Sequence, residues 1–151
     1  MTIISPQKLI PSLCLAGFLL LTTACSTPSN EVFIHKAEII ANQLIDAMAE
    51  QRYADAVKFY DPRFFDRITP DEWQQILARL VEKFGDYRSR KLTASSVEHG
   101  FSTISKATTV LVYSIYYEKK RTVQKFTFLS DEKSDHMVLV GHYIDFPGAI
   151  D

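Results

Sequence analysis

The sequence is short of cysteine, glycine and net charge, and each shortage excludes a class of protein. Its 151 residues include two cysteines and five glycines, and the formal net charge is −1. Without an excess of basic residues there is no electrostatic drive toward phosphates, so we expect no nucleic-acid partner. No glycine-rich phosphate loop, Gly-x-Ser-x-Gly elbow or His-Glu-x-x-His motif occurs. The length allows one folded domain.

Both cysteines lie in the first 25 residues, in or next to an apolar run. The run Leu9–Leu21 contains Cys14 and follows a weakly positive start, and small residues separate it from Cys25. It is shorter than the roughly 20 residues that a helix needs to cross a bilayer. This arrangement predicts an export signal over residues 1–24. After its removal, Cys25 has no partner for an internal disulfide.

The segment Leu21-Thr22-Thr23-Ala24-Cys25 resembles the lipobox of bacterial lipoproteins, whose cysteine receives the lipid. The resemblance implies lipidation of Cys25 and anchoring in a membrane. Because Ser26 rather than aspartate follows, it also implies the periplasmic side of the outer membrane. The family favours leucine three places before the cysteine, where this chain has Thr22. An ordinary secretory signal cut near Ala24, or an uncleaved anchor, is the alternative.

Helical periodicity begins after a short polar tether. Residues 25–30 would hold the lipidated cysteine and the tether, and residues 31–151 the folded domain. Over Glu31–Glu50 the apolar residues recur every three or four positions, which predicts a helix. A second, short helix is expected over Tyr53–Tyr60, and Asp61-Pro62 should end it.

The strongest local signal is the stretch Thr69-Pro70-Asp71-Glu72. It combines an N-cap, a proline at the first helical position and a glutamate placed for a capping box. Apolar residues at helical spacing follow from Trp73 to Phe84, and Gly85 can close the helix in the left-handed conformation. We therefore predict a third helix here.

After Gly85 the apolar spacing changes to that of strands. We predict strands over Tyr87–Val97, Thr108–Glu118, Thr122–Leu129 and His136–Asp145. Helices followed by antiparallel strands make an α+β domain. This order of elements is similar to that of the nuclear transport factor 2 superfamily, a cone-shaped fold close to the cystatin-like folds. The resemblance implies three N-terminal helices packed on one face of a curved antiparallel β-sheet.

The cone of that superfamily often leaves an apolar cavity between helices and sheet. By resemblance, aromatic side chains would surround such a cavity here, and they are Phe59, Phe64, Phe65, Trp73 and Tyr113. An open cavity would make the protein a binder of small apolar ligands or an isomerase-like enzyme. The alternative is that these aromatic side chains simply fill the interior.

Catalysis and metal binding find little support in the sequence. Enzymes of the resembled fold transfer protons with Tyr/Asp or His/Asp groups, for which the candidates are Tyr87, Tyr113, His136, His142 and Asp145. Tyrosine is a common sheet residue, Asp145 is expected to end a strand and His136 to flank a turn, so structural roles are favoured and we assign no catalytic residue. The four histidines are dispersed, and we expect neither a metal nor another cofactor.

The strands carry apolar residues on both faces, although a sheet covered on one side should be polar on the other. The residues predicted for the uncovered face are Val110, Val112, Tyr116, Val138 and Val140. In the last strand we place Ile144 on this same face, and on the opposite face Met137, Leu139 and Tyr143. A large apolar surface of this kind usually marks an interface. We expect it to pair with a second copy or with a subunit of an envelope complex; burial by strong sheet curvature is the alternative.

Overall fold

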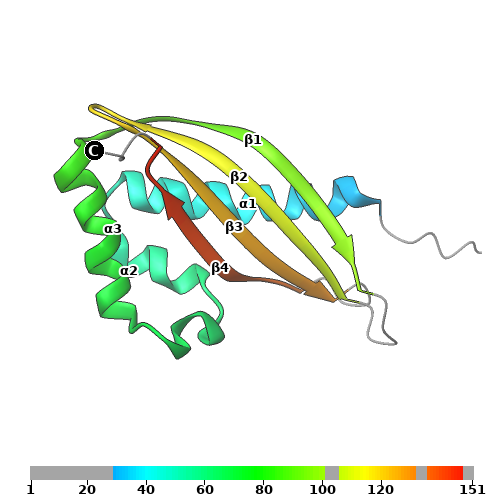
Figure 1. Ribbon diagram of the computed structural model, residues 1–151. Coiled ribbons are helices and arrows are strands. Elements are labelled where there is room, and N and C mark those ends of the chain that lie inside the picture. Colours follow the sequence, from blue (N-terminus) through cyan, green and yellow to red (C-terminus); the bar gives the residue numbers. More distant parts are fainter. Residues whose placement is uncertain (1–28, 101–105, 132–135, 148–151) are drawn as a thin grey trace, which may run out of the picture.

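A computed structural model describes residues 29–100, 106–131 and 136–147. Within these ranges, helical segments precede a four-stranded antiparallel sheet, so the domain is α+β. The spatial order of the strands is their order in the chain, β1-β2-β3-β4, which leaves β1 and β4 as the two edges. Figure 1 shows the sheet as one layer with the helices on one side of it.

Helix α1 (Asn30–Ala49) confirms the first predicted helix and runs along the inner face of the sheet. It contacts β1, β2 and β3, and its buried side includes Leu44 and Ile45. Ala37, Ala41 and Ala47 are also fully buried, and such small side chains let the helix backbone lie close to the strands. An ion pair between Asp46 of α1 and Arg90 of β1 joins the two elements at the edge of the contact.

The expectation of three N-terminal helices packed on one face of the sheet is wrong. The middle segment forms a single α-turn, α2 (Tyr53–Ala56), which continues as the 3-10 turn η1 (Val57–Phe59). A second 3-10 segment, η2 (Pro62–Asp66), follows after an extended residue. Among the helical segments, only α1 lies along several strands, whereas α3 (Pro70–Phe84) has its main contacts with α2 and η1.

The predicted middle helix ends before Tyr60, because the backbone of Tyr60 pairs with strand β4. The Tyr60 backbone is extended, at φ −87° and ψ 142°, and it forms a parallel bridge with Leu139 at the β4 edge. The amide of Asp61 donates to the Leu139 carbonyl over 2.8 Å. Pro62 then keeps Asp61 out of the helical region, since a residue before proline avoids those angles. A tertiary pairing thus overrides the local helical pattern.

The start of α3 is as the sequence predicts. The Glu72 amide donates to Thr69 Oγ1 over 3.2 Å, and the Thr69 amide donates to the Glu72 carboxylate over 2.8 Å, which completes the capping box. Trp73, Leu77, Leu80 and Phe84 are buried on one side of this helix. Gly85 has the positive φ that was expected, 80°, but its ψ of −173° is extended rather than left-handed helical.

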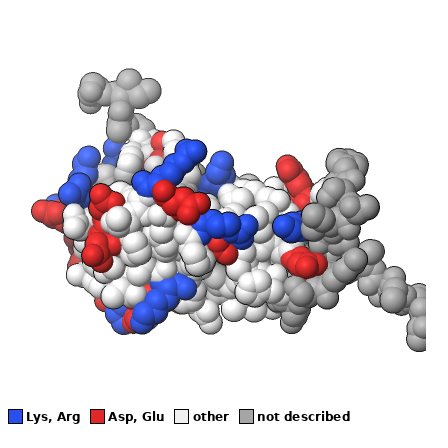
Figure 2. Space-filling model, turned by 90° about the horizontal axis from the view of Figure 1, so that it is seen from below, with Lys and Arg blue, Asp and Glu red and all other residues white. Residues whose placement is uncertain are grey.

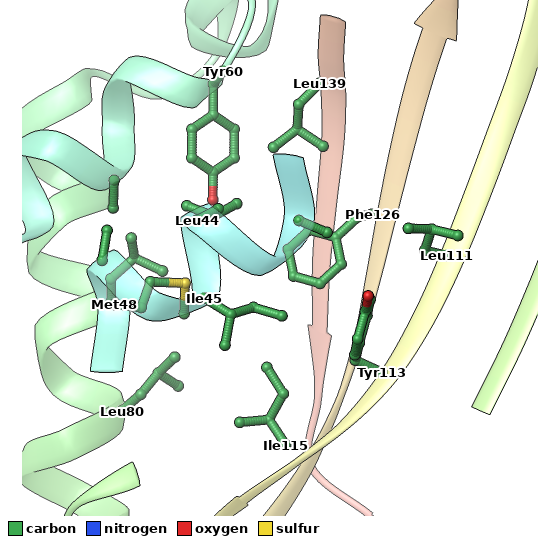
Figure 3. Close-up of a cluster of buried hydrophobic side chains, with 14 of the residues drawn as sticks. Leu44, Ile45, Met48, Tyr60, Leu80, Leu111, Tyr113, Ile115, Phe126 and Leu139 are labelled. Carbon is green, nitrogen blue, oxygen red and sulfur yellow. The ribbon is translucent and has the colours of Figure 1, made fainter. Parts of the chain in front are cut away.

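The strands are β1 (Tyr87–His99), β2 (Lys106–Tyr117), β3 (Arg121–Asp131) and β4 (Met137–Asp145). Each pairs antiparallel with the next. The core lies between α1 and the inner face of β2, β3 and β4, where Leu111, Ile115, Phe126 and Leu139 are fully buried. Figure 3 shows Ile115, Phe126 and Leu139 on the side of the strands that faces Leu44 and Ile45 of α1, with Leu111 farther away beside Phe126.

A bulge in β4 changes which side chains face the core. Leu139 pairs with Phe128 and Gly141 with Thr127, so Val140 is an extra residue opposite β3. Beyond the bulge, His142 and Ile144 lie beside the inward residues of β3, and Tyr143 points outward with 61% of its surface exposed. The predicted sides of Tyr143 and Ile144 are therefore reversed, because one inserted residue shifts the alternation of a strand by one place.

Candidate functional site

A chain of buried and half-buried polar groups joins η1 to the sheet. The Tyr60 hydroxyl lies 2.6 Å from Nδ1 of His142, and Nε2 of the same ring lies 2.9 Å from Oε1 of Gln124. The Gln124 amide nitrogen donates to Oγ1 of Thr122 over 3.2 Å. These positions follow from the register: His142 pairs with Phe126, and Gln124 is its diagonal neighbour on the inner face of β3.

The hydrogen bonds define which ring nitrogen of His142 carries the proton. Oε1 of Gln124 can only accept, so Nε2 must donate to it; in the neutral ring Nδ1 then accepts from the Tyr60 hydroxyl. Burial removes water from the imidazole and lowers the pKa of His142 to about 3. Burial also raises the pKa of the Tyr60 hydroxyl well above its usual value. Near neutral pH both groups are therefore uncharged.

Aromatic rings enclose this polar chain. The His142 ring lies 4.3 Å from Phe126, 5.4 Å from Trp73 and 5.9 Å from Tyr60, measured between ring centroids. Nε1 of Trp73 has no hydrogen bond of normal geometry, although the indole N–H opposes the rise in the Tyr60 pKa. Within the described part of the chain, this buried indole nitrogen is therefore a donor without an acceptor.

The residues predicted to surround a cavity pack mostly against other rings. Phe64 lies 5.2 Å from Phe65 and 5.0 Å from Trp73 between ring centroids, and Tyr113 lies 5.9 Å from Phe126. Phe59 is half-buried against the core from η1. These contacts place Phe64, Phe65 and Trp73 in one cluster around Tyr60, with Tyr113 apart from it on β2. Whether this region opens to admit a ligand stays a prediction.

The candidates for proton transfer do not come together. Tyr87 is half-buried on β1, and His136 is exposed ahead of β4. The carboxylate of Asp145 accepts from the amide of Phe146 over 2.8 Å. His142 lines a surface depression, but a pKa near 3 makes it a weak base at neutral pH. The sequence offered no signal for its partner, because Tyr60 is 82 positions away.

The outer face of the sheet is the second region of interest. Val110, Val112 and Val138 are half-buried there, and Tyr116 is 38% exposed. Val140 lies in the β4 bulge at the margin of this face. Among the described residues, no helix covers these side chains, and Figure 1 shows the helices on the opposite side of the sheet. The predicted interface residues thus share a surface, with Val140 at its edge.

Surface charge is distributed in small groups. On the face seen in Figure 2, the described lysine, arginine, aspartate and glutamate side chains lie intermingled among uncharged surface. A depression of about 370 Å³ lies between η2 and the bulged part of β4, and its lining includes Arg63, Arg67, Lys125 and His142. Local groups of charge therefore matter more here than a long-range field.

The described residues contain no group of three or more His, Cys, Asp or Glu side chains placed to hold a metal ion. Within the same ranges, each helix is too short or too polar to cross a membrane. The predicted signal and its lipidation site, Cys25, lie outside the described residues.

Comparison with known proteins gives no match to a family model, a curated protein or a solved structure. The resemblances to lipoproteins and to the nuclear transport factor 2 superfamily stay predictions.

Proposed function

We propose that the protein is a lipid-anchored module on the periplasmic side of the outer membrane, which assembles with a second copy through the outer face of its sheet. The anchor would be Cys25, followed by a tether too short to let the domain move far from the membrane. A tether of five residues extends to roughly 17 Å. The observation that carries the assembly is the symmetric arrangement of charge on the outer face.

Two charged residues of β1, Lys91 and Glu98, lie opposite β2 residues that are three positions after and three positions before Leu111. Lys91 pairs with Ser114 of β2, and Glu98 pairs with Thr108. Leu111 stands midway between these two β2 partners. Both charged side chains are exposed, and their pairing places them on the outer face with Val110 and Val112.

A second pair of charges has the same midpoint. Arg121 of β3 pairs with Tyr116, and Asp131 pairs with Lys106. Leu111 is again midway in β2 between the two partners, Lys106 and Tyr116. A two-fold axis running across the strands at the level of Leu111 therefore brings Lys91 of one copy opposite Glu98 of the other, and Arg121 opposite Asp131. Such self-complementarity is what a dimer interface with two-fold symmetry requires.

The same axis brings apolar and aromatic groups together at the centre. Val110 would face Val112 of the other copy, and Leu129 would face Val123, because each of these pairs is symmetric about the same level. Lys106 would approach the ring of Tyr116, a favourable cation–π arrangement. Burial of half-exposed valine and leucine side chains supplies the favourable free energy, and the charges select the orientation.

An axis along the strands is the competing arrangement. It would place Lys91 opposite Asp145 and leave the carboxylate of Glu98 opposite the apolar Val138. The carboxylate of Asp145 already accepts a hydrogen bond from the Phe146 amide, whereas Glu98 makes no hydrogen bond or ion pair within the described ranges. We therefore favour the axis across the strands, which gives Glu98 a partner.

A charge exchange tests the assembly. In the full-length protein in neutral detergent, Lys91→Glu and Glu98→Lys should each weaken the dimer about tenfold, equivalent to about 1.4 kcal/mol. The double variant should restore most of the affinity, because the attraction is re-formed with the signs exchanged. Sedimentation equilibrium measures all four proteins.

The outcomes separate the possible partners. If both single variants dimerise more weakly and the double variant does not regain affinity, the axis across the strands is contradicted. If the unmodified protein stays monomeric, but crosslinks from Tyr116 capture an envelope protein, then the face binds a different chain. If neither dimer nor crosslink forms, the proposed role of this face fails.

The anchor is tested separately. Cys25→Ser removes the acceptor for the lipid, so the protein should leave the membrane fraction and appear in the periplasm. Ser26→Ala, which leaves the cysteine in place, is the matched control and should stay with the membrane. Unchanged membrane association of the Cys25→Ser protein would contradict lipidation.

A further inference from the structure

The depression between η2 and β4 has the size of a ligand site. Its volume of about 370 Å³ lies within the range of roughly 300–1,000 Å³ that is usual for small-molecule pockets. One wall comes from η2 and its end, with Phe64 and Arg67, and the other from β3 and β4, with Lys125 and Tyr143. We call it the η2–β4 pocket.

Positive charge in the pocket exceeds negative charge. Arg63 is held by Asp61 through hydrogen bonds at 2.7 and 3.2 Å, which raise the pKa of the arginine and lower that of the carboxyl group. Arg67 and Lys125 have no ion-pair partner within the described ranges, and Asp66 is the one acidic residue of the lining. Two unpaired cations against one acid leave a net positive site in a chain whose total charge is −1.

The bulge of β4 forms the floor of the pocket. A Cβ atom on Gly141 would lie 3.2 Å from Cβ of Thr127, so the close approach of the strands here suits a glycine. The ring of His142 also lines the floor, and both of its nitrogens are already bonded to Tyr60 and Gln124. The floor therefore offers a fixed, uncharged ring and leaves recognition of charge to the walls.

We infer that the η2–β4 pocket binds a small molecule that carries one carboxylate or phosphate group on a flat apolar body. The guanidinium of Arg67 suits either oxyanion, because its planar donors match two oxygens at once. The Lys125 ammonium lies 6.0 Å from the centre of the Tyr143 ring, which places a charge and an aromatic face side by side. Phe64 provides an apolar surface on the other wall for the body of the ligand.

This inference goes beyond assembly through the sheet, although the pocket shares Lys125, Thr127 and Tyr143 with the outer face. The test therefore changes Arg67, which is not on a strand. Arg67 belongs to the segment after η2 and not to the outer face, so its substitution leaves the proposed dimer contacts in place. The test uses benzoate and phenyl phosphate as probes, and benzamide as a neutral molecule of nearly the same shape as benzoate. All are added to the full-length protein in neutral detergent.

Glycine-selective ¹⁵N labelling gives a simple readout, because the chain has five glycines and Gly141 is on the pocket floor. Benzoate and phenyl phosphate should shift the Gly141 amide resonance in a saturable way, and benzamide should not. Arg67→Gln should weaken both anions about tenfold. Arg79→Gln removes the same charge from the neighbouring surface of α3, which is outside this pocket, and should leave the affinity unchanged.

The outcomes decide the inference. No shift of Gly141, an equal shift with benzamide, or equal weakening by Arg67→Gln and Arg79→Gln would overturn it. Phosphatidylglycerol added to the micelles distinguishes two sources of the same chemistry. Competition with phenyl phosphate would assign the site to a lipid headgroup, and a lack of competition would assign it to a free anion.

Discussion

Tyr60 and His142 are each other's hydrogen-bond partners across the core, at 2.6 Å, although they are 82 positions apart in the chain. The bond joins the extended residue after η1 to the strand beyond the β4 bulge. Because Tyr60 also bridges Leu139 through its backbone, one residue ties the helical half of the domain to the edge of the sheet. The stability of the domain should therefore be sensitive to this pair.

Removing the Tyr60 hydroxyl should destabilise the domain. Tyr60→Phe keeps the ring in its aromatic cluster but leaves Nδ1 of His142 buried without a donor, which costs about 1–3 kcal/mol. Tyr143→Phe is the matched control, since that hydroxyl belongs to a side chain with 61% of its surface exposed. Urea unfolding gives the free energy of unfolding of both variants. Equal, small effects would show that the Tyr60 bond contributes nothing to stability.

Acid should destabilise the folded protein as the pH falls below about 6.5, because the pKa of His142 is lowered in the fold. The pKa of His142 is about 3 in the folded protein and near 6.5 when unfolded, so protons bind the unfolded chain more readily. The stabilising contribution is complete above pH 6.5 and is lost as the pH falls toward 3. The loss amounts to about 1.4 kcal/mol per pH unit within that window.

Two histidine variants check the origin of this dependence. His142→Gln should flatten the free energy of unfolding between pH 4 and 6, even though the protein is less stable overall. His35→Gln changes an exposed residue of α1 and should keep the pH dependence of the unmodified protein. A retained slope in the His142→Gln protein would place the titrating group elsewhere.

The α3 helix should depend strongly on its buried leucines. Leu77 is 1% exposed, and Leu77→Ala removes apolar contacts and leaves a cavity, at a cost of about 2–5 kcal/mol. Ile39→Ala on α1 is the comparison, because 47% of that side chain is already exposed and its loss should cost far less. Chemical denaturation gives both values, and a loss below about 1 kcal/mol for Leu77→Ala would mean that the helix is packed differently.

Gly85 should not tolerate a side chain. Its φ of 80° is unfavourable for other residues, and a Cβ atom would lie 2.6 Å from a carboxylate oxygen of Glu118 and 2.8 Å from its Cβ. Gly85→Ala is expected to lower the free energy of unfolding by more than about 1 kcal/mol. Gly100→Ala is the control, since φ there is not in the left-handed region and the nearest atom is 3.3 Å away. Similar melting temperatures for the two variants would contradict the expected strain.

The sequence alone determined the elements whose signals are local. The capping box at Thr69 and Glu72 contains its own hydrogen-bond partners within four residues, so α3 was predictable from the stretch itself. The apolar repeat of α1 and the β-branched residues of β2 are local signals too, because side chains only a few residues apart define the face that will be buried. The two sides of β2 were assigned correctly for this reason.

Only the tertiary structure decided the features that depend on distant partners. The helix predicted over Tyr53–Tyr60 is one α-turn followed by a 3-10 turn, and Tyr60 is extended because its backbone pairs with Leu139. The sequence analysis predicts no bulge, and the reversal of Tyr143 and Ile144 depends on where β3 pairs with β4. The hydrogen bond of His142 and the η2–β4 pocket arise in the same way: chain segments far apart in sequence meet only after folding, and no periodicity within either segment encodes that meeting.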